Sequence, residues 1–530
     1  MTGINVAWSA LGGAPELVAR VVDEVRRDVL DARLPVRETA RACVAGCALA
    51  AAELGARRTG AAEVPAVRVD DGAVATAFVS ERHLRVDGRA SAGFAPLSRF
   101  WRTADGWVRT HANYPHHRER LLTALEVTGG GGPGAGDVDA GAMDARERAV
   151  RERAVRYEVD AVAAALAERT SVEAEDAVYA AGGLAVALRT PEEWAAHPQG
   201  AEVRRLPLVE RGTLDAPPGR PLTPLAPFTP LAPFTPLAPF APVSPLAPRT
   251  GAAGPLLPAA GLRVLDLTRV IAGPVATRTL ALLGADVLRV DAPHLPELPV
   301  QHLDTGFGKR STRLDLAVDG RTFEELLGSA DVVVTGYRPG ALDRFGLSPE
   351  ALAERRPGVV VAQLSAWGAH GPWRERRGFD SLVQVATGIA VAEGSAERPG
   401  ALPAQALDHG TGYLLAAAVL RALTERADDG ASRYVRLSLA RTAEWLLHEV
   451  PRDREVLRAG EGDRRGNGDV DVDRSAVPGG PYGSPDPWLT ERDSPCGRLR
   501  YALPPLSFAN GPKDWAGPPT RWGTDPARWR

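Results

Sequence analysis

A single acidic residue, Asp408, stands at the start of a strongly apolar helical segment, ALDHGTGYLLAAAVL. A carboxylate in the first turn of a helix faces N–H groups without partners and the positive end of the helix dipole, and both favour its ionised form. An ionised carboxylate can act as a nucleophile and form a covalent intermediate. We expect Gly410 and Gly412 to leave room beside it for a bulky substrate. The segment therefore predicts a catalytic aspartate.

The same residue has a simpler interpretation as a helix N-cap. Aspartate is a preferred N-cap residue, and losing such a cap costs about 1 kcal/mol. Residue type alone does not separate the two interpretations, so the surrounding elements must decide between them.

Other reactive residue types favour structural roles. Cys43 and Cys47 lie one helical turn apart in an alanine-rich stretch, where free cysteine packs as a small apolar residue. His116 and His117 are adjacent, so their side chains point in different directions, and no third ligand is spaced near them. We expect these histidines to be packed or solvated, and the basic cluster WRERR to be a solvated loop. We predict no metal site.

Residues 259–450 are expected to form the sheet that positions Asp408. The runs GLRVLDLT, DVLRVDA, ADVVVTGY and GVVVAQLSAWG are typical of buried strands, KRSTRLDL adds another, and helical segments lie between them. This alternation predicts an α/β fold with a Rossmann-like parallel sheet covered by helices on both faces. Ligands of such sheets bind at the carboxyl ends of the strands.

The first crossover turn lacks the common nucleotide-binding loops of this fold class. Its sequence, TRVIAGPVAT, contains one glycine, and neither G-x-G-x-x-G nor GxxxxGK[ST] is present. This argues against a dehydrogenase and against an NTPase.

Composition limits the partners and the location. The 530-residue chain has a net charge of −3 and a pI of about 6.4, which favour neither nucleic acid nor an anionic membrane as a partner. No apolar run reaches about 18 residues, so we expect no membrane span. The N-terminal sequence lacks the basic and apolar regions of a signal peptide. We expect a cytoplasmic protein.

Five segments in a fixed order resemble the family III CoA-transferases. This CaiB/BaiF-type group contains formyl-CoA transferase, carnitine CoA-transferase and the methylacyl-CoA racemases. The segments are GLRVLDLTRVIAGPVATRTLALLGADVLRVDAP, KRSTRLDL, ADVVVTGYRPGALDRFGLSPEAL, GFDSLVQVATG and LDHGTGYLLAAAVLRALTER, within residues 261–447. The resemblance implies an acyl-CoA:carboxylate CoA-transferase in which Asp408 attacks the thioester and forms a mixed anhydride.

The resemblance also implies a set of CoA contacts, with CoA as a substrate and nothing bound permanently. By position these are Val270 and Ala272 at the adenine, Lys309, Arg310 and Arg344 at the phosphates, and Tyr337 beside the pantetheine or adenine. The implied partners are an acyl-CoA, a small carboxylic acid and a second copy of the chain, because family members form interlocked dimers.

Two alternatives stay open. The racemase branch needs a second base and resembles GHD where this chain reads GFD, and Phe379 cannot transfer a proton. The unusual order of segments also allows a non-catalytic CoA-binding or regulatory member of the family.

The residues before the α/β domain resemble parts that normally follow it. FWRTADGWVRTHANYPHHRERLLTAL is similar to the family's small-domain sheet and helix, and RTPEEWAAHPQG is similar to a late segment. A gapless alignment of an internal repeat places Ala40 opposite Asp408, so this copy would lack the nucleophile. We read the N-terminal region as a degenerate α+β segment resembling the family's small and closing domains.

The predicted organisation has seven parts. They are a degenerate CoA-transferase-like segment (1–128), a Gly-rich loop (129–150), a helical closing segment (151–212), a Pro-rich linker with TPLAPF repeats (213–258), the CoA-transferase α/β domain (259–450), a flexible linker (451–486) and a Pro/Trp-rich strap (487–530).

Overall fold

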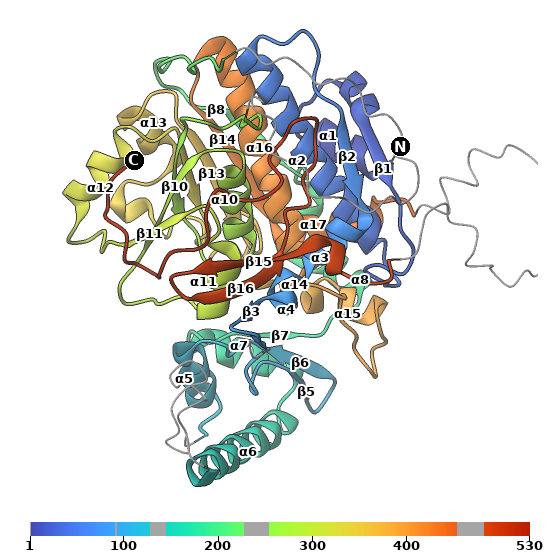
Figure 1. Ribbon diagram of the computed structural model, residues 1–530. Helices are drawn as coiled ribbons and strands as arrows, with labels where there is room; N and C mark the ends of the chain where they lie inside the picture. Colours follow the sequence, from blue (N-terminus) through green and yellow to red (C-terminus); the bar gives the residue numbers. More distant parts are fainter. Residues whose placement is uncertain (1, 91–92, 128–144, 227–253, 453–481) are drawn as a thin grey trace, which may run out of the picture.

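The computed structural model describes residues 2–90, 93–127, 145–226, 254–452 and 482–530 (Figure 1). Most of the predicted Gly-rich loop, all TPLAPF repeats beyond residue 226 and most of the second linker lie outside the described residues. The end of the predicted loop is helical, because α6 begins at Ala145.

A seven-stranded sheet forms the centre of the molecule, in the order β11-β10-β9-β12-β13-β14-β8. Its strands are β8 (Glu210–Thr213), β9 (Arg263–Leu267), β10 (Asp286–Asp291), β11 (Arg310–Arg313), β12 (Val332–Thr335), β13 (Val360–Ser365) and β14 (Arg433–Ser438). Six strands run parallel, which confirms the predicted Rossmann-like sheet. The edge strand β8 is antiparallel to β14 and comes from the N-terminal region.

Helices cover both faces of this sheet because side chains of a buried strand alternate in direction. Val332 and Val360 share a core with α10 and α16, whereas Val333 and Val361 share another with α12 and α13. The helices of this domain are α10 (Ala272–Leu282), α11 (Pro299–Thr305), α12 (Gly320–Leu327), η2 (Asp343–Phe345), α13 (Pro349–Arg355), α14 (Asp380–Ala386), α15 (Ile389–Ala392), α16 (Ala406–Asp429) and α17 (Leu439–His448).

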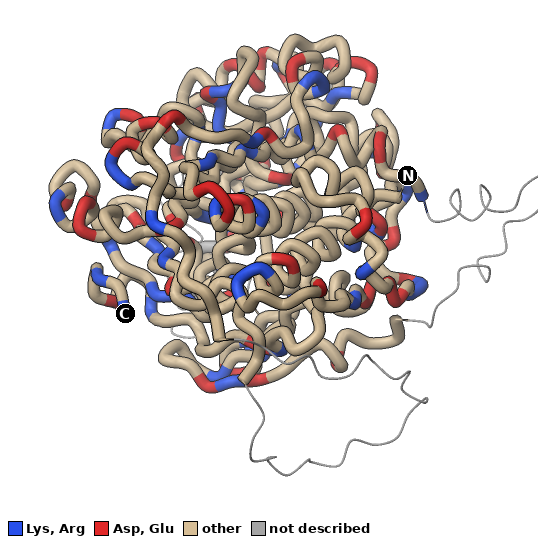
Figure 2. Tube along the Cα trace, turned by 90° about the horizontal axis from the view of Figure 1, so that it is seen from above, with Lys and Arg blue, Asp and Glu red and all other residues tan. Residues whose placement is uncertain are grey.

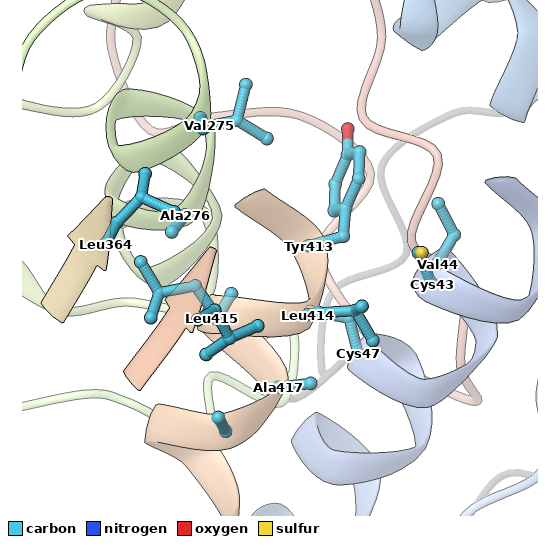
Figure 3. Close-up of a cluster of buried hydrophobic side chains, with 14 of the residues drawn as sticks. Cys43, Val44, Cys47, Val275, Ala276, Leu364, Tyr413, Leu414, Leu415 and Ala417 are labelled. Atoms are coloured by element: carbon cyan, nitrogen blue, oxygen red, sulfur yellow. The ribbon is translucent and has the colours of Figure 1, made fainter. Parts of the chain in front are cut away.

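The longest N-terminal helix, α2 (Val36–Thr59), packs along α16. Cys43 of α2 and Gly410 of α16 are neighbours near the helix starts, and Arg57 pairs with Asp428 near the ends, so the helices run parallel. Figure 3 shows buried side chains of this core, with α16 between α2 on one side and α10 on the other. The elements around α2 are α1 (Gly3–Ala10), η1 (Pro15–Arg20), β1 (Val21–Glu24), β2 (Val67–Asp70), α3 (Asp71–Phe78) and α4 (Ser80–His83), with β1 and β2 parallel. The predicted packing role of Cys43 is confirmed by its complete burial, which also raises the pKa of its thiol.

The two helices correct the predicted alignment of the internal repeat. Both contain 24 residues, and each is followed by a glycine in the left-handed conformation, Gly60 and Gly430. Asp408 is the third residue of α16, so its counterpart is Glu38, the third residue of α2, rather than Ala40. The gapless alignment fails because the two copies differ in the segment between their helices. The segment from the end of α16 to the start of α17 is two residues shorter than the segment from the end of α2 to the start of α3.

Ion pairs fill the region around Glu38. Its carboxylate accepts a hydrogen bond from Arg37 at 2.9 Å. One turn further on, Arg41 pairs with the buried Asp71 at 2.6 Å. Glu38, the counterpart of Asp408, is therefore part of a structural network of charged side chains.

By length and composition alone α2 is apolar enough to cross a membrane, contrary to the expectation from the sequence. Of the qualifying window, 94% is buried inside the molecule, as in a core helix. Figure 2 shows basic and acidic residues interspersed along the described part of the chain.

A small domain projects from the main body (Figure 1). It contains β5 (Phe100–Arg102), β6 (Trp107–Thr110), β7 (Ala185–Ala187), α5 (Pro115–Ala124), α6 (Ala145–Ala167) and α7 (Ser171–Ala180). The three strands are antiparallel, and Val108 and Leu121 lie in its core. The chain returns to the main body through α8 (Pro191–Ala196) and α9 (Pro198–Arg205), which lead into β8.

The C-terminal residues form a hairpin and then an extended strap. They comprise η4 (Asp486–Trp488), β15 (Leu489–Ser494) and β16 (Gly497–Ala502), and β16 pairs with β3 (Arg85–Val86), which pairs with β4 (Arg89–Ala90). Beyond the hairpin, the Trp515 ring lies 5.2 Å from that of Phe307, and Trp529 Nε1 donates to the Leu326 carbonyl at 3.0 Å. The strap therefore wraps over the α/β domain.

Candidate active site

A cavity of about 380 Å³ opens at the carboxyl ends of the parallel strands, the position that the fold class favours for a ligand. The α/β domain and the small domain both line it. The predicted residues among its lining are Val270, Ala272, Tyr337 and Asp408. The structure thus brings the candidate nucleophile together with three of the six predicted CoA contacts.

Asp408 is not the N-cap of its helix. The N-cap position of α16 is Gln405, which makes no capping hydrogen bond through its side chain. The backbone N–H of Asp408 donates to Asp380 Oδ2 at 2.8 Å, so Asp380 satisfies the helix start from a neighbouring helix. The carboxylate of Asp408 makes no hydrogen bond with any described residue and faces the cavity that it lines.

Burial and like charge raise the pKa of Asp408 well above its ordinary value. Burial is the largest cause, and the charges of Asp380 and Glu81 add to it. Burial also raises the pKa of Asp380 to about 6, although hydrogen bonds from Asp408 and Gln384 oppose the shift. Desolvation and like charges therefore oppose the effect of the helix start, which was predicted to keep Asp408 ionised.

The N-terminal region also contacts the residue next to the candidate nucleophile. His409 is fully buried, its ring is stacked on Phe78 of α3 at 5.4 Å, and its Nε2 lies 3.6 Å from Glu81 Oε2. These contacts hold the first turn of α16 against α3 and α4. His409 is not among the residues that line the cavity.

The two glycines after Asp408 serve helix packing, which corrects their predicted role. A Cβ at Gly412 would lie 2.6 Å from the carbonyl oxygen of Ala272, closer than real Cβ contacts. A Cβ at Gly410 would lie 3.4 Å from Cys43 Sγ. Gly412 therefore permits the close approach of α16 and α10, and neither glycine borders the cavity.

Val270 adopts a strained backbone conformation at the cavity wall. Its φ of 72° is rare for a β-branched residue. Its N–H donates to Glu297 Oε2 at 2.9 Å, and Tyr114 of the small domain donates to Glu297 Oε1 at 2.6 Å. Burial opposes ionisation of Glu297, yet Arg289 and Arg269 lower its pKa to about 2. A buried carboxylate thus fixes Val270 and ties the small domain to it.

The three basic residues predicted at the phosphates lie outside the cavity lining. Lys309 is buried, and its Nζ donates to Asp266 Oδ2 at 3.0 Å. Arg310 pairs with Asp286 at 2.8 Å. Arg344 is exposed, and its guanidinium lies over the ring of Phe345 at 4.7 Å. These placements do not support phosphate contacts by the three side chains.

Other arginines line the cavity, and three of them have no carboxylate among their hydrogen-bond partners in the described residues: Arg120, Arg338 and Arg377. Their side chains donate to backbone carbonyls instead, at 3.2 Å, 3.0 Å and 3.5 Å respectively. Burial lowers the pKa of Arg377, and the charges of Arg338 and Arg120 lower it further. The three side chains form a positive cluster. The only sequence signal was the WRERR motif, which we expected to be a solvated loop.

The two small-domain histidines line the same cavity as Asp408, a place that the sequence did not indicate. His117 is also buried, as the expectation of packing had it, and His116 is partly exposed. The His117 ring lies 5.8 Å from that of Phe379, and burial lowers the pKa of His117 to about 2. A neutral imidazole therefore faces the candidate nucleophile's cavity. The described residues hold no group of three potential metal ligands.

The fold and the site together define an α/β protein with a carboxylate nucleophile candidate in a basic cavity at the carboxyl edge of its sheet. The family model of CoA-transferase family III matches residues 10–224 and 259–489, so the chain belongs to this family. The first stretch shows that the N-terminal region is family sequence as well.

Named relatives match part of the chain. An acetyl-coenzyme A transferase of Hypoxylon pulicicidum is 37% identical over 207 residues, which cover 37% of this chain and 35% of the relative. A probable fatty acyl-CoA transferase of Mycobacterium tuberculosis is 34% identical over 203 residues, covering 35% and 52%. A CaiB/BaiF family protein of Brucella suis has a solved structure with 25% identity and a TM-score of 0.36, covering 46% of this chain and 65% of that one. The chain thus spans about half or less of the two curated relatives' lengths.

Proposed function

We propose that this protein is an acyl-CoA:carboxylate CoA-transferase in which Asp408 forms a mixed anhydride with the acyl group. The observation that carries the proposal is the carboxylate of Asp408, which lines the cavity and has no hydrogen-bond partner among the described residues. Membership of CoA-transferase family III supports it. The partners proposed are an acyl-CoA and a small carboxylic acid.

The chemistry begins when a carboxylate oxygen of Asp408 attacks the thioester carbonyl. The C–S bond breaks, CoA leaves as a thiolate, and the acyl group stays on Asp408 as an anhydride. An acceptor carboxylate then displaces the first acid from this anhydride. Attack of the thiolate on the acceptor's carbonyl gives the new thioester and restores the Asp408 carboxylate.

The three cavity arginines are better placed than Lys309, Arg310 and Arg344 to bind the phosphates of CoA. Guanidinium groups donate paired hydrogen bonds to phosphate, and Arg120, Arg338 and Arg377 have donors to spare. We keep Val270, Ala272 and Tyr337 as the contacts of the remaining parts of CoA.

One chain supplies cavity residues from both of its halves, because Tyr114 and Arg120 belong to the small domain. A second copy is therefore not needed to build the cavity described here. The homodimer stays a prediction, to be checked by light scattering.

The proposal is tested by trapping the intermediate. Protein incubated with an acyl-CoA and then with hydroxylamine is expected to carry a hydroxamate on Asp408, detected by mass spectrometry of the peptide. Asp408→Asn, which keeps the shape of the side chain, is expected to give no adduct and to lose transfer activity. Full transfer activity in Asp408→Asn would overturn the mechanism.

A second candidate is a CoA-ester isomerase, favoured by His117 in the same cavity as Asp408. An aspartate and a neutral histidine can remove and return a proton at the α-carbon of a thioester. The same samples decide between the candidates: α-deuterium incorporation from heavy water without CoA transfer indicates the isomerase. Tight CoA binding with neither reaction indicates a non-catalytic member of the family.

A further inference from the structure

A second cavity, of about 470 Å³, lies at the amino ends of the sheet strands. Arg426, in the last turn of α16, lines it, so it lies at the opposite end of this helix from Asp408. Arg58, in the last turn of α2, and residues 220–223 line it from the N-terminal half. The cavity is thus a junction between the two halves of the chain and separate from the candidate active site.

Five arginines line this junction cavity, and Asp331 is the one carboxylate among its lining residues. Asp331 Oδ1 lies 3.2 Å from Arg426 and 3.7 Å from Arg356. Its Oδ2 accepts the backbone N–H of Arg263 at 3.1 Å. A single carboxylate therefore serves two guanidinium groups and one backbone N–H, and it forms no ion pair with the other three arginine side chains of the lining.

The remaining arginines have no carboxylate partner among the described residues. Arg58 donates to the backbone carbonyls of Thr223 at 2.8 Å and of Pro258 at 2.8 Å. The side chains of Arg220 and Arg263 form no hydrogen bond or ion pair with the described part of the chain. The lining thus carries five positive charges and one negative charge.

Two of these guanidinium groups are also deeply buried. Arg426 is 1% exposed, and its Nε has no hydrogen-bond partner, while Arg58 is 5% exposed. Burial lowers the pKa of both side chains, and only Asp331 opposes it through attraction. Buried, like-charged groups are costly unless a counter-charge is present.

We propose that the junction cavity binds a compact phosphorylated anion with two or more negative charges. Guanidinium groups match phosphate oxygens in geometry and charge. The volume lies in the range of small-molecule sites. A bound anion would contact Arg58 from one half and Arg263 from the other, so it would stabilise their junction by binding the folded state alone.

Pyrophosphate is the probe for a direct test on the full-length protein. Titration calorimetry and thermal unfolding are performed at low ionic strength with saturating CoA, which is expected to fill the catalytic cavity. We expect saturable binding of one pyrophosphate per chain and a rise in the unfolding temperature. The double variant Arg220→Gln/Arg263→Gln should bind about tenfold or more weakly, because it loses two charged donors.

Two further variants test whether the pyrophosphate binds at the junction cavity. Arg321→Gln, whose side chain is 95% exposed on α12, is the matched control and should bind like the wild type. Unchanged binding in the double variant, or no saturable binding at millimolar pyrophosphate, would overturn the proposal. Loss of binding in Arg377→Gln would place the anion in the catalytic cavity and also overturn it. Because Arg377 lines only the catalytic cavity of the two, this variant locates the bound pyrophosphate even if CoA does not bind there.

Discussion

At the residue scale, burial and neighbouring carboxylates raise the pKa of Asp408. Three carboxyl groups, those of Asp408, Asp380 and Glu81, lie near one another in a buried region, and burial is the largest cause of the raised pKa of the first two. The neighbouring carboxyl groups of Asp408 and Asp380 titrate as a unit. A charge on either carboxyl group therefore opposes ionisation of the other.

The raised pKa values predict a pH-dependent stability. The folded-state pKa of Asp380 is about 6, against an ordinary value of 3.8. A carboxyl group with a raised folded pKa contributes stability that is fully present below its ordinary pKa and lost as pH rises through the folded value. We expect this pair to lower the unfolding free energy by on the order of 1–3 kcal/mol between about pH 4 and pH 7. Urea unfolding across this range measures the change.

Asp408→Asn should reduce that loss of stability, because a neutral amide removes the like charge beside Asp380. Asp493→Asn, at a site that is 85% exposed in its side chain, is the matched control and should keep the wild-type pH dependence. An unchanged pH slope in Asp408→Asn would show that the two carboxyl groups do not interact.

At the element scale, the position of Asp408 depends on how closely α16 approaches α10. Gly412 allows this approach, and its substitution by alanine would bring a Cβ to 2.6 Å from a backbone oxygen that cannot move alone. We expect Gly412→Ala to destabilise the protein by about 1–3 kcal/mol, as overpacking does. Transfer activity should fall as well, because the helix that carries the proposed nucleophile is displaced. Thermal unfolding and turnover measure the two effects.

Gly410→Ala is the matched control for this prediction, two residues away on the same helix. Its Cβ would meet Cys43 Sγ at 3.4 Å, which a small shift relieves. Alanine is favoured over glycine within a helix by about 1 kcal/mol, so this variant should be near neutral. If Gly410→Ala lowers stability and activity as much as Gly412→Ala, then the close approach of α16 to α10 does not explain the glycine at position 412.

The elements of the α/β domain were predictable from sequence because buried parallel strands leave continuous apolar runs. Each predicted strand between residues 259 and 450 is present, and Asp408, Val270 and Tyr337 meet at one cavity as expected. Edge strand β8 was not predictable, because the sequence of Glu210–Thr213 is polar and its partner lies more than two hundred residues away.

The candidate phosphate contacts show the limit of motif reasoning. Lys309 has the residue type for a phosphate ligand, yet its Nζ donates hydrogen bonds to Asp266 and Thr277. No local sequence pattern indicates these hydrogen bonds. Arg120 was overlooked and His117 was given no place in the site, for the converse reason. They come from the small domain, and only the folded chain places them opposite Asp408.

At the scale of the whole molecule, the two halves form one body through three contacts of different kinds. Helices α2 and α16 share an apolar core, β8 completes the sheet of the α/β domain, and β16 of the C-terminal hairpin pairs with β3. The N-terminal half thus contributes one element, α2, β8 or β3, to each of these contacts. Its own counterpart of Asp408, Glu38, lies in a network of ion pairs, so we infer one active site per chain.

This arrangement predicts that the connection between residues 227 and 253 is a tether and that the halves hold together without it. A site for a specific protease is inserted there, and the purified protein is cleaved. The fragments are expected to elute together and to keep their unfolding temperature and turnover, because separating them would expose the apolar core between α2 and α16 and leave the edge of β14 unpaired. The uncut variant is the control. Fragments that separate in size-exclusion chromatography, or lose activity on cleavage, would show that the covalent link itself maintains the cavity between the two halves.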